Sequence, residues 1–166
     1  RGKRQSHDGS RVFRTSLMHI QSEPIYKTEF GALFCADSLE FMRHMPDESV
    51  DLVLTSPPYA LHFKKEYGNA NQQDYIAWFL PFAREIKRII KPSGSFVLNL
   101  GGAWQPGLPI RSLYHYRVLL TLADEVGFDL AQEFFWFNPA KMPAPAEWVN
   151  VRRIRVKDSV EYIFWL

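Results

Sequence analysis

The sequence of 166 residues has little cysteine and no long apolar run. Its single cysteine, Cys35, excludes an intramolecular disulfide framework and fits a reducing compartment. No apolar run approaches the ~20 residues that a membrane span needs. The first residues lack the apolar core of a signal peptide, so we expect neither a membrane segment nor export. The 20 basic and 18 acidic residues leave a net charge of +2, which by itself says little about partners.

What the sequence does contain is enough for a packed core. Hydrophobic residues make up 46% and aromatic residues 15% of the chain, and a domain of this length buries roughly 70% of its unfolded surface. Apolar runs typical of buried strands alternate with helical patterns, which predicts an α/β domain with mostly parallel strands and an antiparallel final pair. Residues 1–22 are basic and poor in apolar positions, so we expect a flexible tail before a domain at residues 23–166.

The expected elements follow one another in strand–helix order. Strands are predicted at residues 32–36, 50–54, 95–100, 129–137 and 160–166, and helices at residues 37–45, 74–91 and 111–126. Pro81 predicts a kink or a break in the second helix, residues 92–94 should end it, and Gly127 should terminate the third. The aromatic residues 134–137 are expected to lie mostly in the core, with one or two rings facing a pocket.

Thr55, Ser56, Pro57, Pro58 and Tyr59 follow the strand predicted at residues 50–54. The two prolines have no N–H to donate to a neighbouring strand, and the residue before each proline is held in an extended conformation. The result is a stiff, exposed corner at the carboxyl end of a strand, where open α/β sheets bind their ligands. It presents the Ser56 hydroxyl, the Pro57 carbonyl and the aromatic face of Tyr59.

These groups suit one demanding reaction, an attack by the exocyclic amine of a nucleobase. This amine is a poor nucleophile because its lone pair is delocalised into the ring. Two acceptors on its hydrogens would draw the nitrogen toward tetrahedral geometry, and an aromatic ring would hold a base that has left its helix. A plain strand-ending turn explains the same residues, so the neighbouring sequence has to decide.

Asp37 and Ser38 open the helix predicted at residues 37–45. Asp37, with Glu40 three residues later, fits a helix cap. A carboxylate at the carboxyl end of a strand could also accept hydrogen bonds from the nucleoside part of a cofactor. The two roles are compatible, and both stay open.

Several stretches of the sequence, in the same order along the chain, resemble the cytosine-N4-specific DNA methyltransferases of the circularly permuted class. The resemblance spans residues 26–166 and rests on residues 35–40, 51–59 with the S-P-P-Y motif, 64–69, 94–104, 111–116 and 138–158. It implies the Rossmann-like, doubly wound fold of S-adenosylmethionine-dependent methyltransferases. It also implies transfer of a methyl group to the N4 amine of a flipped-out cytosine in double-stranded DNA. The protein would then be a cytoplasmic bacterial enzyme of a restriction–modification system, with no metal and no membrane partner.

The resemblance also assigns site residues. It implies a catalytic role for Ser56, Pro57, Pro58 and Tyr59, which would hold the cytosine. Contact with S-adenosylmethionine is implied for Asp37, Ser38, Thr55 and Ser56, and a bordering pocket for Asn99, Gly101, Gly102 and Trp104.

Five basic residues are expected to contact DNA phosphates, namely Lys64, Lys65, Arg152, Arg153 and Arg155. Apolar residues alternate with basic ones over residues 151–157, which predicts an extended segment with some of the charges on one face. A solvated loop and a charged strand edge explain the same residues without DNA.

Two features depart from the family pattern. Asn99 stands where a related sequence has an acidic residue that could receive the proton lost from the amine, and an amide cannot take up that proton. The proton then leaves through Ser56 and water, or the acid is not essential. The glycine-rich loop that lets the backbone approach S-adenosylmethionine is absent. We therefore expect a fragment without this motif and without the target-recognition region, completed by a downstream segment or a second chain.

Other functions stay open. Adenine-N6 methylation is the nearest rival because the same pocket serves either amine, whereas cytosine-C5 chemistry needs a thiolate and the lone cysteine lies inside a predicted strand. A non-catalytic module of the same fold would bind DNA without the methyl donor. A protein methyltransferase acting on a side-chain amide uses a similar corner and would label protein rather than DNA.

Overall fold

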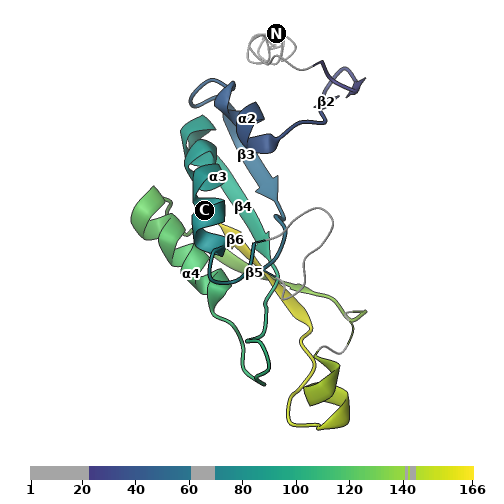
Figure 1. Ribbon diagram of the computed structural model, residues 1–166. Coiled ribbons are helices and arrows are strands. Elements are labelled where there is room, and N and C mark those ends of the chain that lie inside the picture. The colour runs from purple at the N-terminus through teal and green to yellow at the C-terminus, as the bar shows by residue number, and fades with distance from the viewer. Residues whose placement is uncertain (1–22, 61–69, 141, 143–144) are drawn as a thin grey trace, which may run out of the picture.

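The computed structural model describes residues 23–60, 70–140, 142 and 145–166 (Figure 1). The predicted tail at residues 1–22 and the lysines Lys64 and Lys65 lie outside the described residues. No helix in the described part of the chain is long and apolar enough to cross a membrane.

A four-stranded sheet organises the chain. Its spatial order is β3 (Val50–Thr55), β4 (Ile90–Leu100), β6 (Val160–Trp165) and β5 (Gln132–Phe137). Helix α3 (Tyr75–Ile89) joins β3 to β4, which run parallel, whereas β6 is antiparallel to both β4 and β5. The antiparallel final pair is confirmed. The expectation of a mostly parallel sheet is confirmed in part. β3, β4 and β5 run in the same direction, but only β3 and β4 pair in parallel, because β6 lies between β4 and β5 and runs opposite to both.

Alternate residues along these strands point to opposite faces of the sheet. Phe96, Leu98, Leu100 and Phe164 point to one face, have no exposed surface, and pack with residues of α3 and α4 (Tyr114–Thr121) in the core. We call this the covered face, and Figure 1 shows both helices on it.

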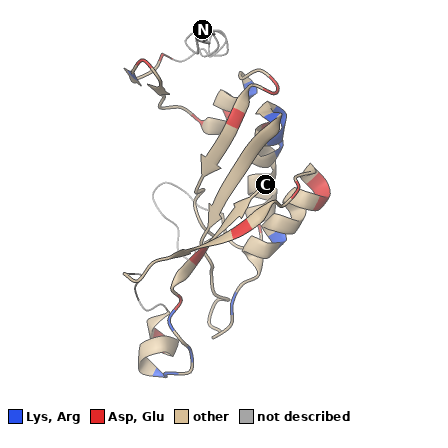
Figure 2. Cartoon of the chain, turned by 180° about the vertical axis from the view of Figure 1, so that it is seen from behind, with Lys and Arg blue, Asp and Glu red and all other residues tan. Residues whose placement is uncertain are grey.

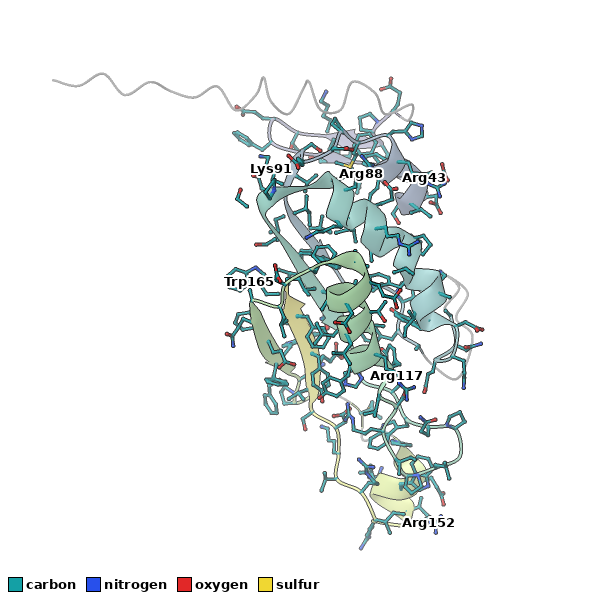
Figure 3. All side chains as sticks on the ribbon, turned by 90° about the vertical axis from the view of Figure 1, so that its left-hand side faces the viewer. Arg43, Arg88, Lys91, Arg117, Arg152 and Trp165 are labelled. Atoms are coloured by element: carbon teal, nitrogen blue, oxygen red, sulfur yellow. The ribbon has the colours of Figure 1, made fainter. Side chains whose placement is uncertain are left out.

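The opposite face, which we call the open face, is covered by no helix among the described residues. In the pairing register Leu54 lies beside Val97, Val97 beside Trp165, and Phe134 beside Ile163, so these side chains share this face. Five large hydrophobic residues of this face are 40% to 69% exposed, namely Leu52, Leu54, Phe134, Trp136 and Trp165. Figure 2 views the molecule from behind, and its strands carry few charged residues. Figure 3 shows Trp165 on the side of the sheet away from the helices.

Helix α3 forms because its apolar residues recur at helical spacing. Tyr75, Phe79, Ala83, Ile86 and Ile89 are buried along one side. The helix runs unbroken through Pro81, so of the predicted kink or break the break is wrong. Pro81 and Ala77, whose carbonyl loses its partner to the proline, are both exposed, and water can satisfy that carbonyl.

The end of α3 also differs from the prediction. The helix stops at Ile89, and β4 begins at Ile90 rather than at residue 95. Residues 92–94 lie within β4, where the register with β3 shifts between the pairs Val50–Ile90 and Leu52–Ser95. Gly94 is needed there because a Cβ atom would lie 2.8 Å from Ile90 Cγ2 and 3.0 Å from the carbonyl oxygen of Asp51.

Helix α4 begins at Tyr114, later than predicted. The backbone of Arg111 forms an isolated antiparallel β-bridge with Trp104, and the N–H of Ser112 donates to the carbonyl of Ala103 at 2.8 Å. The first two residues of the predicted helix are therefore extended. The helix continues into the π-helical turn η1 (Leu122–Val126) and ends at Gly127, whose φ of 82° suits glycine. The predicted terminator is confirmed.

The strand expected at residues 32–36 is shorter and lies outside the main sheet. β2 (Ala32–Leu33) pairs with β1 (Tyr26–Lys27) in a separate two-stranded hairpin. Helix α2 (Ser38–Arg43) follows, and Asp37 Oδ1 accepts a hydrogen bond from the N–H of Glu40 at 3.0 Å. This confirms the predicted helix cap.

Two expectations about the last third of the chain are wrong. Residues 134–137 are 49% to 63% exposed rather than core, because β5 is the edge strand. Residues 151–157 do not form an extended segment. Instead η2 (Glu147–Val151) is a helical turn, the N–H of Arg152 donates to the carbonyl of Glu147, and Arg153 has a φ of 53°.

Candidate functional site

The corner after β3 has the shape that its sequence predicts. β3 ends at Thr55, Ser56 is exposed, and the chain turns through Pro57 and Pro58 to bring Tyr59 back against the sheet. The Tyr59 ring is half-buried beside Gly101 at the end of β4. A Cβ atom on Gly101 would lie 2.3 Å from the ring, so only glycine leaves room for it. The two predicted sites therefore meet, one from each of the two parallel strands.

A chain of hydrogen bonds leads from this corner to a carboxylate. Ser56 Oγ lies 3.1 Å from Tyr59 Oη, which donates to Glu161 Oε2 at 2.8 Å. Asn99 Oδ1 lies 3.3 Å from the same hydroxyl. Asn99 and Glu161 point to the same face of the sheet from β4 and β6, where Asn99 pairs with Ile163. The corner thus unites three elements that are far apart in the sequence.

The ionisation state of Tyr59 follows from this setting. The pKa of Tyr59 is raised to about 12, chiefly by burial and also by the hydrogen bond and charge of Glu161, while the hydrogen bond with the Ser56 hydroxyl opposes this rise. Tyr59 is therefore a neutral phenol at physiological pH. It can pass hydrogen bonds along but does not act as a base by itself.

Tyr114 holds Gly101 from the other side. Its hydroxyl donates to the Gly101 carbonyl, and the ring has almost no exposed surface. Burial raises the pKa of Tyr114 above its ordinary value, so it also remains a neutral donor. The end of β4 therefore lies between Tyr59 and Tyr114. Because Tyr114 belongs to the buried core, the core fixes Gly101 and with it the position of the Tyr59 ring.

A cavity of about 870 Å³ opens beside the corner. It lies between the start of α2, the end of β3 and one side of α3, and it brings Asp37, Ser38, Thr55 and Ser56 together. Trp78, Phe79 and Phe82 of α3 supply its aromatic wall. The four residues predicted to contact a cofactor therefore share one cavity, whereas Asn99, Gly101, Gly102 and Trp104 lie outside its lining.

Trp104 lies in a separate cluster with arginines. The Arg155 guanidinium is 3.9 Å from the centre of a Trp104 ring, and Arg155 Nη1 donates to the Pro109 carbonyl. Arg111 lies 5.5 Å from the same residue and bonds Asp158 at 2.9 Å. A Cβ atom on Gly102 would lie 2.1 Å from Arg111 Nη2, so Gly102 makes room for that guanidinium. Trp104 and Gly102 thus serve the packing of this cluster.

The arginines predicted to contact DNA phosphates fall into two groups. Arg155 is engaged inside the protein by Trp104 and Pro109, whereas Arg152 and Arg153 are exposed. Figure 3 shows Arg152 at the end of the molecule that carries η2. Of the predicted basic residues that the structure describes, only the pair Arg152 and Arg153 is presented to solvent.

Sequence reasoning missed Glu161 and the aromatic wall of the cavity. Glu161 lies in the otherwise apolar strand Val160–Trp165, and a single carboxylate in such a strand was the available signal. Trp78 and Phe82 follow the helical spacing of the core residues beside them, so their spacing does not distinguish them from core residues.

The sequence profile of the DNA methylase family, which covers N6 and N4 methyltransferases, matches residues 50–166. The type II methyltransferase M.PvuII of Proteus hauseri is 52% identical over 149 residues, which cover 90% of this chain and 44% of that protein.

Solved structures agree in fold. The structure of the PvuII DNA methyltransferase (cytosine-N4-specific) superposes with a TM-score of 0.79 at 52% identity, over 88% of this chain and 52% of that one. A putative DNA modification methylase from Thermus thermophilus, complexed with S-adenosyl-L-methionine, superposes with a TM-score of 0.56 at 21% identity, over 78% and 49%, which shows a shared fold. The chain spans about half the length of these relatives.

Proposed function

The chain belongs to the N6/N4 DNA methylase family, and we propose that the completed protein methylates the exocyclic N4 amine of a cytosine in double-stranded DNA. The methyl donor would be S-adenosylmethionine, and the base would be flipped out of its helix. By analogy with its type II relative the protein would serve a restriction–modification system in the bacterial cytoplasm.

The position of Ser56 carries this proposal. Ser56 both lines the cavity and starts the hydrogen-bond chain through Tyr59. It therefore lies where a donor in the cavity and a base held at the corner would meet. A binding module would have no need for such a hydroxyl between the two places.

The cavity residues fit the donor. A cavity of about 870 Å³ is in the range of small-molecule sites. Capping of α2 uses Asp37 Oδ1, which leaves the second carboxylate oxygen to accept hydrogen bonds from ribose hydroxyls. Trp78 and Phe82 offer aromatic faces to a purine and to a cationic sulfonium. When bound, the donor supplies an electrophilic methyl group on sulfur.

The residues of the corner act on the base. The Ser56 oxygen and the Pro57 carbonyl would accept the two hydrogens of the amine, which localises the nitrogen lone pair. Tyr59 holds the corner in place and offers the exposed part of its ring to the base. Pro57 and Pro58 keep the acceptors fixed, so that no reorganisation is needed when the amine arrives.

A further segment would complete the enzyme. The chain spans 44% of M.PvuII, contains no glycine-rich donor loop, and leaves the apolar open face exposed in its described residues. We assign that segment, downstream in the same protein or on a second chain, to the open face. Covering this face with helices would give the doubly wound arrangement expected of the fold. The same segment would supply the region that reads the target sequence.

Nucleoside mass spectrometry tests the proposed reaction. DNA is incubated with S-adenosylmethionine and the chain together with any segment that continues it in its gene. We expect N4-methylcytosine. Ser56→Ala should lower turnover by about 100-fold or more, with donor affinity nearly unchanged, because Ser56 acts on the amine. Ser93→Ala, at an exposed serine of β4 far from the corner, is the matched control.

The other functions give different results in the same assay. N6-methyladenine would identify the adenine enzyme. Absence of any methylated base from the completed protein, with DNA binding that survives Ser56→Ala and ignores the donor, would replace our proposal by the binding module. Labelled protein without labelled DNA would indicate a protein methyltransferase.

A further inference from the structure

Glu161 stands in an unusual place for a carboxylate. It is partly buried in an apolar strand, lies beside Asn99 on the open face, and accepts the hydrogen bond of Tyr59 at 2.8 Å. An amine that gains a methyl group must lose a proton, and neither the Ser56 hydroxyl nor the Asn99 amide can keep that proton near neutral pH. We propose that Glu161 is the positioning residue that orients the Tyr59 and Ser56 hydroxyls and finally receives the proton of the amine. This inference rests on the proposed function.

The direction of the hydrogen bonds follows from donor and acceptor chemistry. An ionised carboxylate only accepts, so the single proton of the Tyr59 hydroxyl points to Glu161. Tyr59 Oη is then an acceptor toward Ser56, and the proton of the Ser56 hydroxyl points to Tyr59. Both lone pairs of Ser56 Oγ are left for the N–H of the amine. Glu161 thereby turns an ambiguous serine into a hydrogen-bond acceptor at the corner.

The hydrogen-bond chain from Ser56 through Tyr59 to Glu161 accounts for every proton and electron pair of the methyl transfer. The amine nitrogen bonds to the methyl carbon as the carbon–sulfur bond of the sulfonium donor breaks, with its electron pair staying on sulfur. The nitrogen releases one proton to Ser56 Oγ, Ser56 passes its own proton to Tyr59 Oη, and Tyr59 passes its own to Glu161. Tyr59 never becomes a free phenolate, which agrees with its pKa of about 12.

Other carboxylates near the corner are committed elsewhere. Asp158 forms an ion pair with Arg111, and Asp37 caps α2 and faces the cavity. Two titratable groups that interact with Glu161 are Tyr59, from the corner, and Tyr114, from α4. Both are neutral phenols, so neither competes with Glu161 for the proton.

Spectroscopic titration of Tyr59 tests the contact without donor or DNA. The phenolate absorbance of Tyr59 is isolated as the difference between each protein and its Tyr59→Phe variant. Glu161→Gln should lower the pKa of Tyr59 by about one unit, because the carboxylate charge is removed. Glu161→Asp, which keeps the charge, should retain most of the raised value. An unchanged Tyr59 titration in Glu161→Gln would overturn the inference.

A double-mutant cycle on the completed protein tests the role in transfer. Glu161→Gln should lower single-turnover methyl transfer by about 100-fold with little change in KM for DNA. In the Tyr59→Phe background the same substitution should have almost no further effect, since Glu161 acts through that hydroxyl. Additive losses, or a loss in KM alone, would contradict the inference. Absence of any methylated base with the wild-type protein would instead reject the proposed function, and the Tyr59 titration would still decide the contact.

Discussion

The two faces of the sheet differ although the same four strands form them. On the covered face Phe96, Leu98 and Phe164 have no exposed surface beneath α3 and α4. On the open face Leu54, Phe134 and Trp165 are equally apolar and stay 40% to 69% exposed. Burial on each face therefore depends on which helices the chain supplies, and among the described residues only the covered face is packed against helices. The stability of this chain should come from one face, and the other should serve an interface.

The largest expected effect is a difference in unfolding free energy between the same Phe→Ala substitution made on the two faces. Phe164→Ala should lower the free energy of unfolding by about 3–5 kcal/mol, because it leaves a cavity in a packed core. Phe134→Ala should lower it by less than about 1 kcal/mol, because its ring is half exposed. Chemical denaturation of both variants measures the difference. Equal losses would show that the open face is covered in solution.

A charge on the open face should act on assembly rather than on folding. Leu52→Glu should leave the unfolding free energy of the chain within about 0.5 kcal/mol. It should weaken association with the completing segment by roughly 50-fold, because an unpaired charge would be buried. Calorimetric titration of chain and segment gives the affinity. Leu120→Glu on the exposed side of α4 is the control, and an equal loss there would argue against the open face as the interface.

A smaller effect, on stability as a function of pH, comes from His115 in the helix layer over the covered face. His115 on α4 is fully buried, and neither ring nitrogen has a hydrogen-bond partner among the described residues. Burial, with the Arg111 charge adding to it, lowers the pKa of His115 to about 4 from an ordinary 6.5. Between these values the unfolded chain binds the extra proton, so stability is retained above pH 6.5 and falls as the pH drops toward 4, by about 2–3 kcal/mol.

Denaturation midpoints at several pH values measure this loss. His115→Phe should remove that part of the pH dependence while keeping the packing against Tyr116 and Tyr162, whose ring centres lie 4.2 and 4.5 Å away. If the wild type and the variant lose stability in parallel as the pH falls, the buried imidazole is not the cause.

Much of the site was predictable because its causes are local. The Ser56–Tyr59 corner follows from two prolines after an apolar strand, and the Asp37 cap follows from residues three apart. The place of β6 between β4 and β5, the exposure of residues 134–137 and the helical turn at η2 were not predictable, because they depend on pairing and packing between distant segments.

The sequence by itself determined where strands stop, which helix is capped and which residues offer chemistry at the corner. Backbone restriction and side-chain spacing act between residues that are close in the sequence, so their effects can be predicted from the sequence alone. Only the tertiary structure brought Glu161 to Tyr59 across 102 residues, gathered Asp37 and Ser56 around one cavity, and left one face of the sheet open. Strand order and register decide these meetings, and they are set by the burial of the whole core rather than by any single stretch.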